Sequence, residues 1–152
     1  MVVRKMKRGD FDQYKILRKA GLEDHQKLTG EKFKISSKQI KKEFEGILDG
    51  KKRIILVVEK SRKIQGYIIG TLMKNAYQCI AYIDDLFVAK DSRKMGLGKN
   101  LVNKFSKWSK VKKATIIRLG VKINNKKAVN LYKKLGFKIK YYEMEKGQVG
   151  FS

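Results

Sequence analysis

The chain has 152 residues, 42% of them hydrophobic, and its 38 Lys and Arg against 14 Asp and Glu give a net charge of +24. These values predict one domain over residues 1–152 with one core, and they exclude wholesale disorder. No apolar run approaches the ~20 residues of a membrane span, and no signal peptide is visible. The single cysteine, Cys79, excludes an internal disulfide, so we expect a cytoplasmic protein without membrane association.

The first half of the chain is expected to form hairpins and two helices. Asp10 can cap a first helix, which gives way to a loop or broken helix at residues 25–35. Ser37 begins a second helix that closes near Gly50. Strands are expected at residues 2–7, 54–59, 64–73 and 79–88.

The second half alternates helices and strands. Residues 97–109 form an amphipathic helix with Leu101 and Phe105 on its apolar face. A strand at 114–121, a helix at 126–135 and a last strand at 137–144 follow. Hairpins in one half and a β-α-β-α-β order in the other imply a mixed α/β sheet.

The most informative segment is residues 93–98, with the sequence Arg-Lys-Met-Gly-Leu-Gly. It follows an apolar run and opens the amphipathic helix, so unpaired backbone N–H groups and the positive end of the helix dipole meet there. Two glycines let a ligand approach the backbone closely. This pattern indicates a phosphate site. A dinucleotide motif would need a third glycine where Leu101 stands, and the Gly-Lys-Ser/Thr of a P-loop is absent.

The positive charge is concentrated in the second half of the chain. Between Ser92 and Tyr142 there are 16 Lys or Arg and no Asp or Glu. A Lys-rich composition of the kind found in thermophiles would supply acids to pair with the lysines, and this half supplies none. Such a field attracts polyanions. Nucleic acid, a ribosome and an acidic protein remain open as partners.

Three signals occur in a characteristic order: the strand Ile-Asp-Asp-Leu-Phe-Val at 83–88, the glycine loop at 93–98, and Asn125-x-x-Ala128-x-x-Leu131-Tyr132-x-x-x-Gly136-Phe137. With these residues the chain resembles the GCN5-related N-acetyltransferase (GNAT) family. The resemblance is specific over residues 80–140. It implies a mixed, mostly antiparallel sheet of 6–7 strands with about four helices. It also implies a V-shaped split between strands four and five that takes acetyl-CoA.

The resemblance also implies cofactor-binding residues. The family's diphosphate contacts would come from the backbone of Met95, Gly96, Leu97, Gly98 and Lys99, with Arg93 and Lys94 beside them. The main chain of Phe87 and Val88 would pair with the pantetheine arm. The Leu86 N–H would bind the thioester carbonyl and stabilise its developing charge. Asn125 would contact the pantetheine or nearby groups, and Lys133 or Lys134 the outer phosphates.

Two side chains are candidates for proton transfer. The family's tyrosine falls on Tyr132, which would protonate the departing thiolate; its alternative role is packing beside Leu131 and Leu135. Asp84 is the candidate base, acting through water, with Asp85 as the alternative or as a site for a cationic acceptor. Because the two are adjacent on a strand, we expect them to face opposite sides of the sheet.

The expected function is therefore acetyl transfer from acetyl-CoA to a primary amine by direct attack. Small amines, polyamines and protein amines all remain open as acceptors. The family's acceptor pocket would be shaped near Glu23, Asp24 and His25, with Glu31 and Phe33 in the same loop. A non-catalytic module of the same fold that binds CoA or nucleic acid is the alternative. No metal site is expected, since no Cys, His and Asp cluster has ligand spacing. Monomer and homodimer both remain open, the latter through strand pairing by residues 137–151.

Overall fold

The computed structural model describes residues 1–148 and contains one five-stranded sheet of order β1-β2-β3-β4-β5. Its strands are β1 (Val2–Lys5), β2 (Arg53–Lys60), β3 (Lys63–Lys74), β4 (Cys79–Val88) and β5 (Ile116–Leu119). The first four pair antiparallel and β5 pairs parallel to β4. The predicted mixed, mostly antiparallel sheet is thus confirmed, with five strands in residues 1–148 in place of the expected 6–7.

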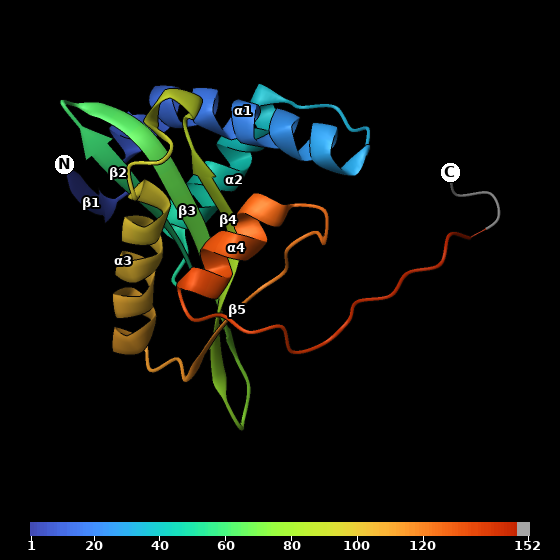
Figure 1. Ribbon diagram of the computed structural model, residues 1–152. Coiled ribbons are helices and arrows are strands. Elements are labelled where there is room, and N and C mark those ends of the chain that lie inside the picture. The colour runs from blue at the N-terminus through green and yellow to red at the C-terminus, as the bar shows by residue number, and fades with distance from the viewer. Residues whose placement is uncertain (149–152) are drawn as a thin grey trace.

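Helices cover both faces of the sheet, and apolar periodicity explains why (Figure 1). On one face lie α1 (Phe11–Thr29) and α2 (Ser37–Asp49), and on the other α3 (Leu97–Val111) and α4 (Lys126–Lys134). Under α1 and α2 the core includes Tyr14, Phe44 and Tyr67. Under α3 it includes Leu101 and Phe105, both fully buried. Apolar residues three and four positions apart place each helix's core side chains on one stripe.

Glycine makes the contact between α3 and the sheet possible. A Cβ on Gly70 would lie 2.0 Å from Cε2 of Phe105, so only glycine leaves room for that ring. A register shift in the β3–β4 pairing occurs at the same place, because Ile69 pairs with Asp85 whereas Gly70 pairs with Ile83. Asp84 is therefore an extra residue in β4, a β-bulge.

Three local predictions are wrong in the described residues. The first helix does not break at residue 25 but continues to Thr29 and ends at Gly30, which has φ +73°. Asp10 occupies the N-cap position of α1 but makes no side-chain cap hydrogen bond. The strand expected at 137–144 does not form: Phe137 still packs against the core under α3, but residues 137–148 have no strand structure (Figure 1), and Tyr142 is 90% exposed. Alternation of apolar residues suits a strand, but a strand also needs a neighbour to bond to. Of the segment proposed for pairing between copies, residues 149–151 lie outside the described residues.

The Asp10 carboxylate instead joins β1 to the start of α1. It accepts hydrogen bonds from Nη1 and Nη2 of Arg4 at 2.7 and 2.9 Å and from the backbone N–H of Lys7 at 2.7 Å. Arg4 also donates to Glu59 of β2 at 2.6 Å. The Arg4 hydrogen bonds hold the pKa of Asp10 below its ordinary value of 3.8.

We expect Asp10→Asn to lower the free energy of unfolding by about 2–3 kcal/mol, the usual range for hydrogen bonds to charged groups. Because the folded pKa of Asp10 is depressed, its contribution is complete above the unfolded pKa of about 3.9 and is lost as the pH falls through the folded value. Urea denaturation of both proteins at a series of pH values measures this. A difference that stays constant down to the most acidic pH would contradict the ion-pair explanation.

Candidate functional site

Strands β4 and β5 separate halfway along β4. Residues Ile80 to Ile83 pair with Ile116 to Leu119, and no residue of β5 pairs with β4 beyond this point. The split expected between strands four and five is therefore present. Asp84 is the first β4 residue past the last pair, so the bulge lies at the apex of the split.

The bulge places both aspartates on the same face of the sheet, which corrects the expectation of opposite faces. Asp84 Oδ2 accepts from Oγ1 of Thr71 at 2.5 Å, and Asp85 Oδ2 accepts from the Tyr67 hydroxyl at 2.8 Å. Tyr67 and Thr71 are four residues apart on β3, so their side chains project from one face, the face under α1 and α2. The extra residue breaks the alternation that separates neighbours in a regular strand.

Asp85 is held by three donors. Besides Tyr67, Nη1 of Arg18 donates to Oδ2 at 2.7 Å and the backbone N–H of Leu86 donates to Oδ1 at 2.9 Å. Burial and then the charge of Asp85 raise the pKa of the Tyr67 phenol well above 10.0. Tyr67 therefore stays a neutral donor to Asp85 at physiological pH.

The Leu86 N–H and the Val88 carbonyl lie on the open edge of β4. Ala89 N donates to the Gln65 carbonyl on β3, so by alternation Phe87 also turns its main chain to β3, and Leu86 and Val88 turn theirs away. In the structure each of these outward groups forms a hydrogen bond with a side chain. The Leu86 N–H donates to Oδ1 of Asp85, and the Val88 carbonyl accepts from Nε of Arg93 at 3.0 Å. Of the two residues expected to pair with an extended ligand, Val88 presents its main chain to the split, and Phe87 does not.

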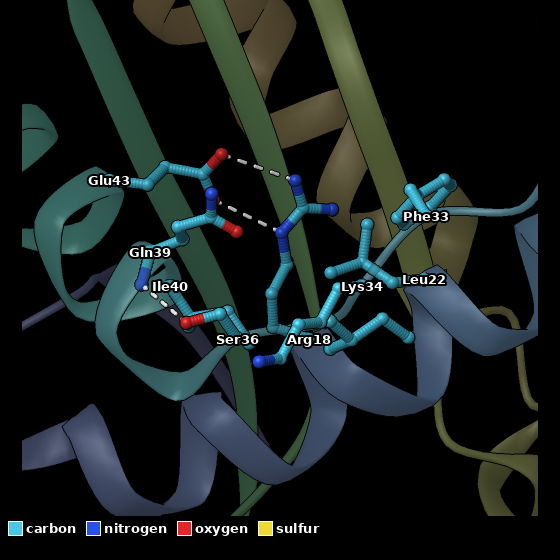
Figure 2. A pocket seen from close by; sticks show the side chains of 9 residues that line it. Arg18, Leu22, Phe33, Lys34, Ser36, Gln39, Ile40 and Glu43 are labelled. Atoms are coloured by element: carbon cyan, nitrogen blue, oxygen red, sulfur yellow. Dashed lines mark hydrogen bonds and ion pairs between the residues drawn. The ribbon is translucent and has the colours of Figure 1, made fainter.

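Arg18 connects Asp85 to a pocket between α1 and α2 (Figure 2). Its Nε and Nη2 donate to the two oxygens of Glu43 at 3.1 and 3.2 Å, while Nη1 reaches Asp85. The pocket has a volume of about 180 Å³ and is lined by Arg18, Leu22, Phe33, Lys34, Ile35, Ser36, Gln39, Ile40 and Glu43. Phe33, expected near an acceptor pocket, lies in its wall.

Sequence reasoning missed Arg18 and Glu43, although the pattern contained a signal. Arg18 lies four residues after Tyr14 and four before Leu22, on the core-facing stripe of α1. Glu43 lies three residues after Ile40 on the corresponding stripe of α2. A charged residue at a core position is rarely buried unless it is paired. Two such positions on adjacent helices indicate an ion pair.

The glycine loop leads into the N-terminus of α3, as predicted. Gly96 is the N-cap with φ +74°, and Lys94 also has a left-handed backbone, with φ +63°. A Cβ on Gly98 would lie 3.4 Å from Leu131 of α4 and 3.9 Å from Leu86 of β4, so this glycine brings the helix start close to the split. The first-turn N–H groups, at Leu97 to Lys99, have no acceptor within the helix. They form a site suited to an anion.

Arg93 is positioned beside this loop. Its guanidinium lies 5.5 Å from the centroid of the Phe87 ring, and Nη2 is 3.1 Å from Oδ2 of Asp24 on α1. Exposed Met95 and Lys99 border the same helix start. Arg93 and Lys99 therefore add positive charge beside the helix start, while Asp24 and the exposed Asp91 contribute negative charge.

Tyr132 lies on α4, beside the split. Its ring meets Phe137 edge-on at 5.5 Å and packs against the core under α3. Burial, with the negative charge of Asp85, raises the pKa of Tyr132 to about 12. Asn125 caps α4 by accepting from the Ala128 N–H at 3.2 Å, and exposed Lys134 is in the last turn. Asn125 thus has a structural role independent of any ligand.

Two absences can be stated for residues 1–148. No group of three or more His, Cys, Asp or Glu is arranged to hold a metal ion. None of the helices in this range has the length and apolar character needed to cross a bilayer.

Comparison with known proteins decides the family. Residues 18–137 match the acetyltransferase (GNAT) family. The chain belongs to this family. The predicted resemblance, based on the glycine loop and the Asn125–Phe137 segment, is thereby confirmed.

Relatives of this GNAT chain support the assignment. Over 68 residues it is 40% identical to an uncharacterized N-acetyltransferase of Methanocaldococcus jannaschii, a match that covers 45% of this chain and only 29% of that protein. A Bacillus halodurans protein, solved as a tetramutant, shares the fold with a TM-score of 0.85, 24% identity and coverage of 97% of this chain and 100% of that one. An aminoglycoside N-acetyltransferase solved in complex with CoA has a TM-score of 0.82, 14% identity and coverage of 97% and 94%.

Proposed function

We propose that this protein transfers the acetyl group of acetyl-CoA to a primary amine by direct attack, without an acyl-enzyme. The observation that carries the proposal is the convergence of a helix start suited to an anion, an open strand edge and a partly buried tyrosine at one split, in a member of the GNAT family. The CoA complex of the aminoglycoside N-acetyltransferase with the same fold adds support.

The residues present fit a cofactor with phosphates and an extended amide arm. The N–H groups of residues 97–99, flanked by Arg93, Lys94 and Lys99, suit the diphosphate. The outward main chain of Leu86 and Val88 suits an arm added as an extra strand. Gly96 and Gly98 permit the close approach. We assign the outer phosphates to Lys134, which is exposed in the last turn of α4.

The chemistry assigns three roles to this chain. Acetyl-CoA supplies an activated acyl group whose carbonyl oxygen gains charge as the amine attacks. The Leu86 N–H gives up its hydrogen bond to Asp85, donates to that carbonyl oxygen instead and so stabilises the developing charge. The C–N bond forms, the C–S bond breaks, the attacking nitrogen gives up a proton through water to Asp84, and Tyr132 donates its proton to the sulfur.

Asp84 suits the base role better than Asp85. Donors occupy both oxygens of Asp85 and fix its carboxylate between α1 and β4. Asp84 Oδ2 bonds Thr71 and lies 3.7 Å from Arg53, its side chain is 31% exposed, and within residues 1–148 its Oδ1 makes no hydrogen bond. Asp84 is therefore open to a water molecule, and Asp85 is a positioning group.

The function is tested by mixing the protein with acetyl-CoA and a panel of small amines, polyamines and peptides, and titrating the thiol released. Calorimetry with CoA accompanies it. We expect CoA binding and thiol release with at least one amine. CoA binding with no release from any amine would assign a non-catalytic module instead, and no binding at millimolar CoA would remove the site altogether.

Asp84→Asn is expected to lower kcat/KM for the amine by about 10²-fold and to move the acidic limb of its pH profile. Protonation of the amine also contributes to that limb, so the shift relative to wild type with the same amine identifies the base and not merely a weakened fold. Asp12→Asn, on the exposed side of α1, is the matched control and should keep the wild-type profile. An Asp84→Asn protein with the normal rate and limb would transfer the role to another group.

A further inference from the structure

The outer face of α3 and the turn after it carry a cluster of lysines. We call this surface the α3 lysine face; its exposed members are Lys104, Lys107, Lys110, Lys112 and Lys113. The opposite side of the helix is buried against the sheet through Leu101 and Phe105. The lysines therefore project away from the core and, lying beyond the first turn of α3, away from the glycine loop.

These lysines have no partners in the folded chain. Of the 16 Lys and Arg between Ser92 and Tyr142, only Arg93 and Lys122 form ion pairs within residues 1–148. If the Lys-rich composition served thermal stability, networks with acids would be expected. Like charges at this density repel one another, and a polyanion bound to the surface would relieve that repulsion.

We propose that the α3 lysine face binds the phosphate backbone of double-stranded nucleic acid, independently of sequence. Lys110 lies six positions after Lys104, a rise of about 9 Å along the helix, enough to meet successive phosphates with three ammonium groups. Phosphate contacts position a protein and carry no sequence information directly. DNA and RNA duplexes share this chemistry, so both are probes in the test.

The composition of the face favours a duplex over other polyanions. The other exposed residues of α3 beyond its first turn are Asn103, Ser106 and Val111. The partly buried ring of Trp108 packs against the core and Phe105, so no fully exposed aromatic ring stands among the lysines for unpaired bases to stack on. A protein partner would need an apolar interface core, and one exposed valine does not make one. An anionic membrane would need an apolar helix face, and that of α3 is buried.

The test measures binding to fluorescent duplexes of about 20 base pairs by anisotropy, from about 50 to 200 mM salt. The variant K104Q/K107Q/K110Q should reduce the slope of log K against log salt by about 2–3, since each phosphate contact contributes about 0.9. The control K38Q/K41Q/K42Q removes the same charge from the exposed side of α2, which also carries Glu45 and Asp49. This control variant should keep most of the wild-type slope of log K against log salt. Circular dichroism and CoA calorimetry establish that each variant is folded and binds cofactor as before.

Several results would overturn the proposal. If both triple variants lost the same amount of salt-dependence slope, net charge alone and not the α3 lysine face would account for duplex binding. A single strand that binds as tightly as the duplex would indicate single-stranded nucleic acid as the partner. Polyglutamate that displaces the protein as well as a duplex of equal charge would indicate an acidic protein. No binding at about 50 mM salt would exclude the site. None of these outcomes bears on acetyl transfer, because neither variant alters a residue placed at the split.

Discussion

Replacing Arg18 by Met is expected to lower the free energy of unfolding by about 3 kcal/mol, the lower end of the cost of breaking a buried ion pair, because the partly exposed carboxylates that remain keep other donors. The Arg18 side chain is 14% exposed and lies between the carboxylates of Glu43 and Asp85. Without it, two negative charges remain on one face of the sheet beside the buried Tyr67 hydroxyl. Methionine keeps much of the apolar stem, so the effect reports the guanidinium and not a cavity. Urea denaturation at pH 7 measures it.

Arg8→Met is the matched control. Arg8 pairs with Asp49, but the two side chains are 66% and 63% exposed. An exposed ion pair contributes about 0–1 kcal/mol, so this change should have little effect. Adding Glu43→Gln to Arg18→Met removes one of the stranded charges and should recover part of the loss. Equal effects of Arg8→Met and Arg18→Met, or no recovery in the double variant, would contradict the buried network.

Replacing Tyr132 by Phe is expected to lower kcat by about 10²-fold while leaving the KM for acetyl-CoA little changed. The ring, and with it the packing on Phe137, is retained, so what is lost is the proton donated to the departing sulfur. The effect is limited because a thiol has a pKa of about 8.5 and its thiolate leaves without much assistance.

The pH profile adds a second readout for Tyr132. With its pKa raised to about 12, the phenol remains protonated through neutral and moderately alkaline pH. Wild-type kcat should therefore show no basic limb from Tyr132 below about pH 11. Tyr82→Phe is the control: Tyr82 lies on the part of β4 that is still paired with β5. An unchanged kcat in Tyr132→Phe would leave Tyr132 only its packing role.

Much of the cofactor half of the site follows from local sequence. The αL conformation at Gly96 and the helix that starts at Leu97 depend on glycine and on a neighbouring apolar stripe, both visible in the chain. The α4 segment is equally local, since Asn125 caps it and Tyr132 lies two turns on. Interactions within a few residues are encoded where they act.

The acceptor half was less predictable because it depends on pairing between distant segments. The bulge at Asp84 arises from the register of β4 against β3, and it lies beside Gly70, where Phe105 of α3 packs on the sheet. Arg18 and Asp85 are 67 residues apart in sequence and meet only after α1 docks on the sheet. The alternating segment 137–144 shows the converse: it has a strand-like pattern but forms no backbone pairing with the edge strand β5, and it remains irregular.

The sequence by itself determined the order of helices and strands as far as α4, the glycine turn at the start of α3 and the family of this protein, because these depend on residue periodicity and on glycine at particular positions. Only the tertiary structure decided which face the two aspartates share, and that Asp85 is tied to Arg18 while Asp84 lies open. The physical reason is that strand register and the burial of paired charges are properties of segments brought together in space, and no local stretch of sequence contains them.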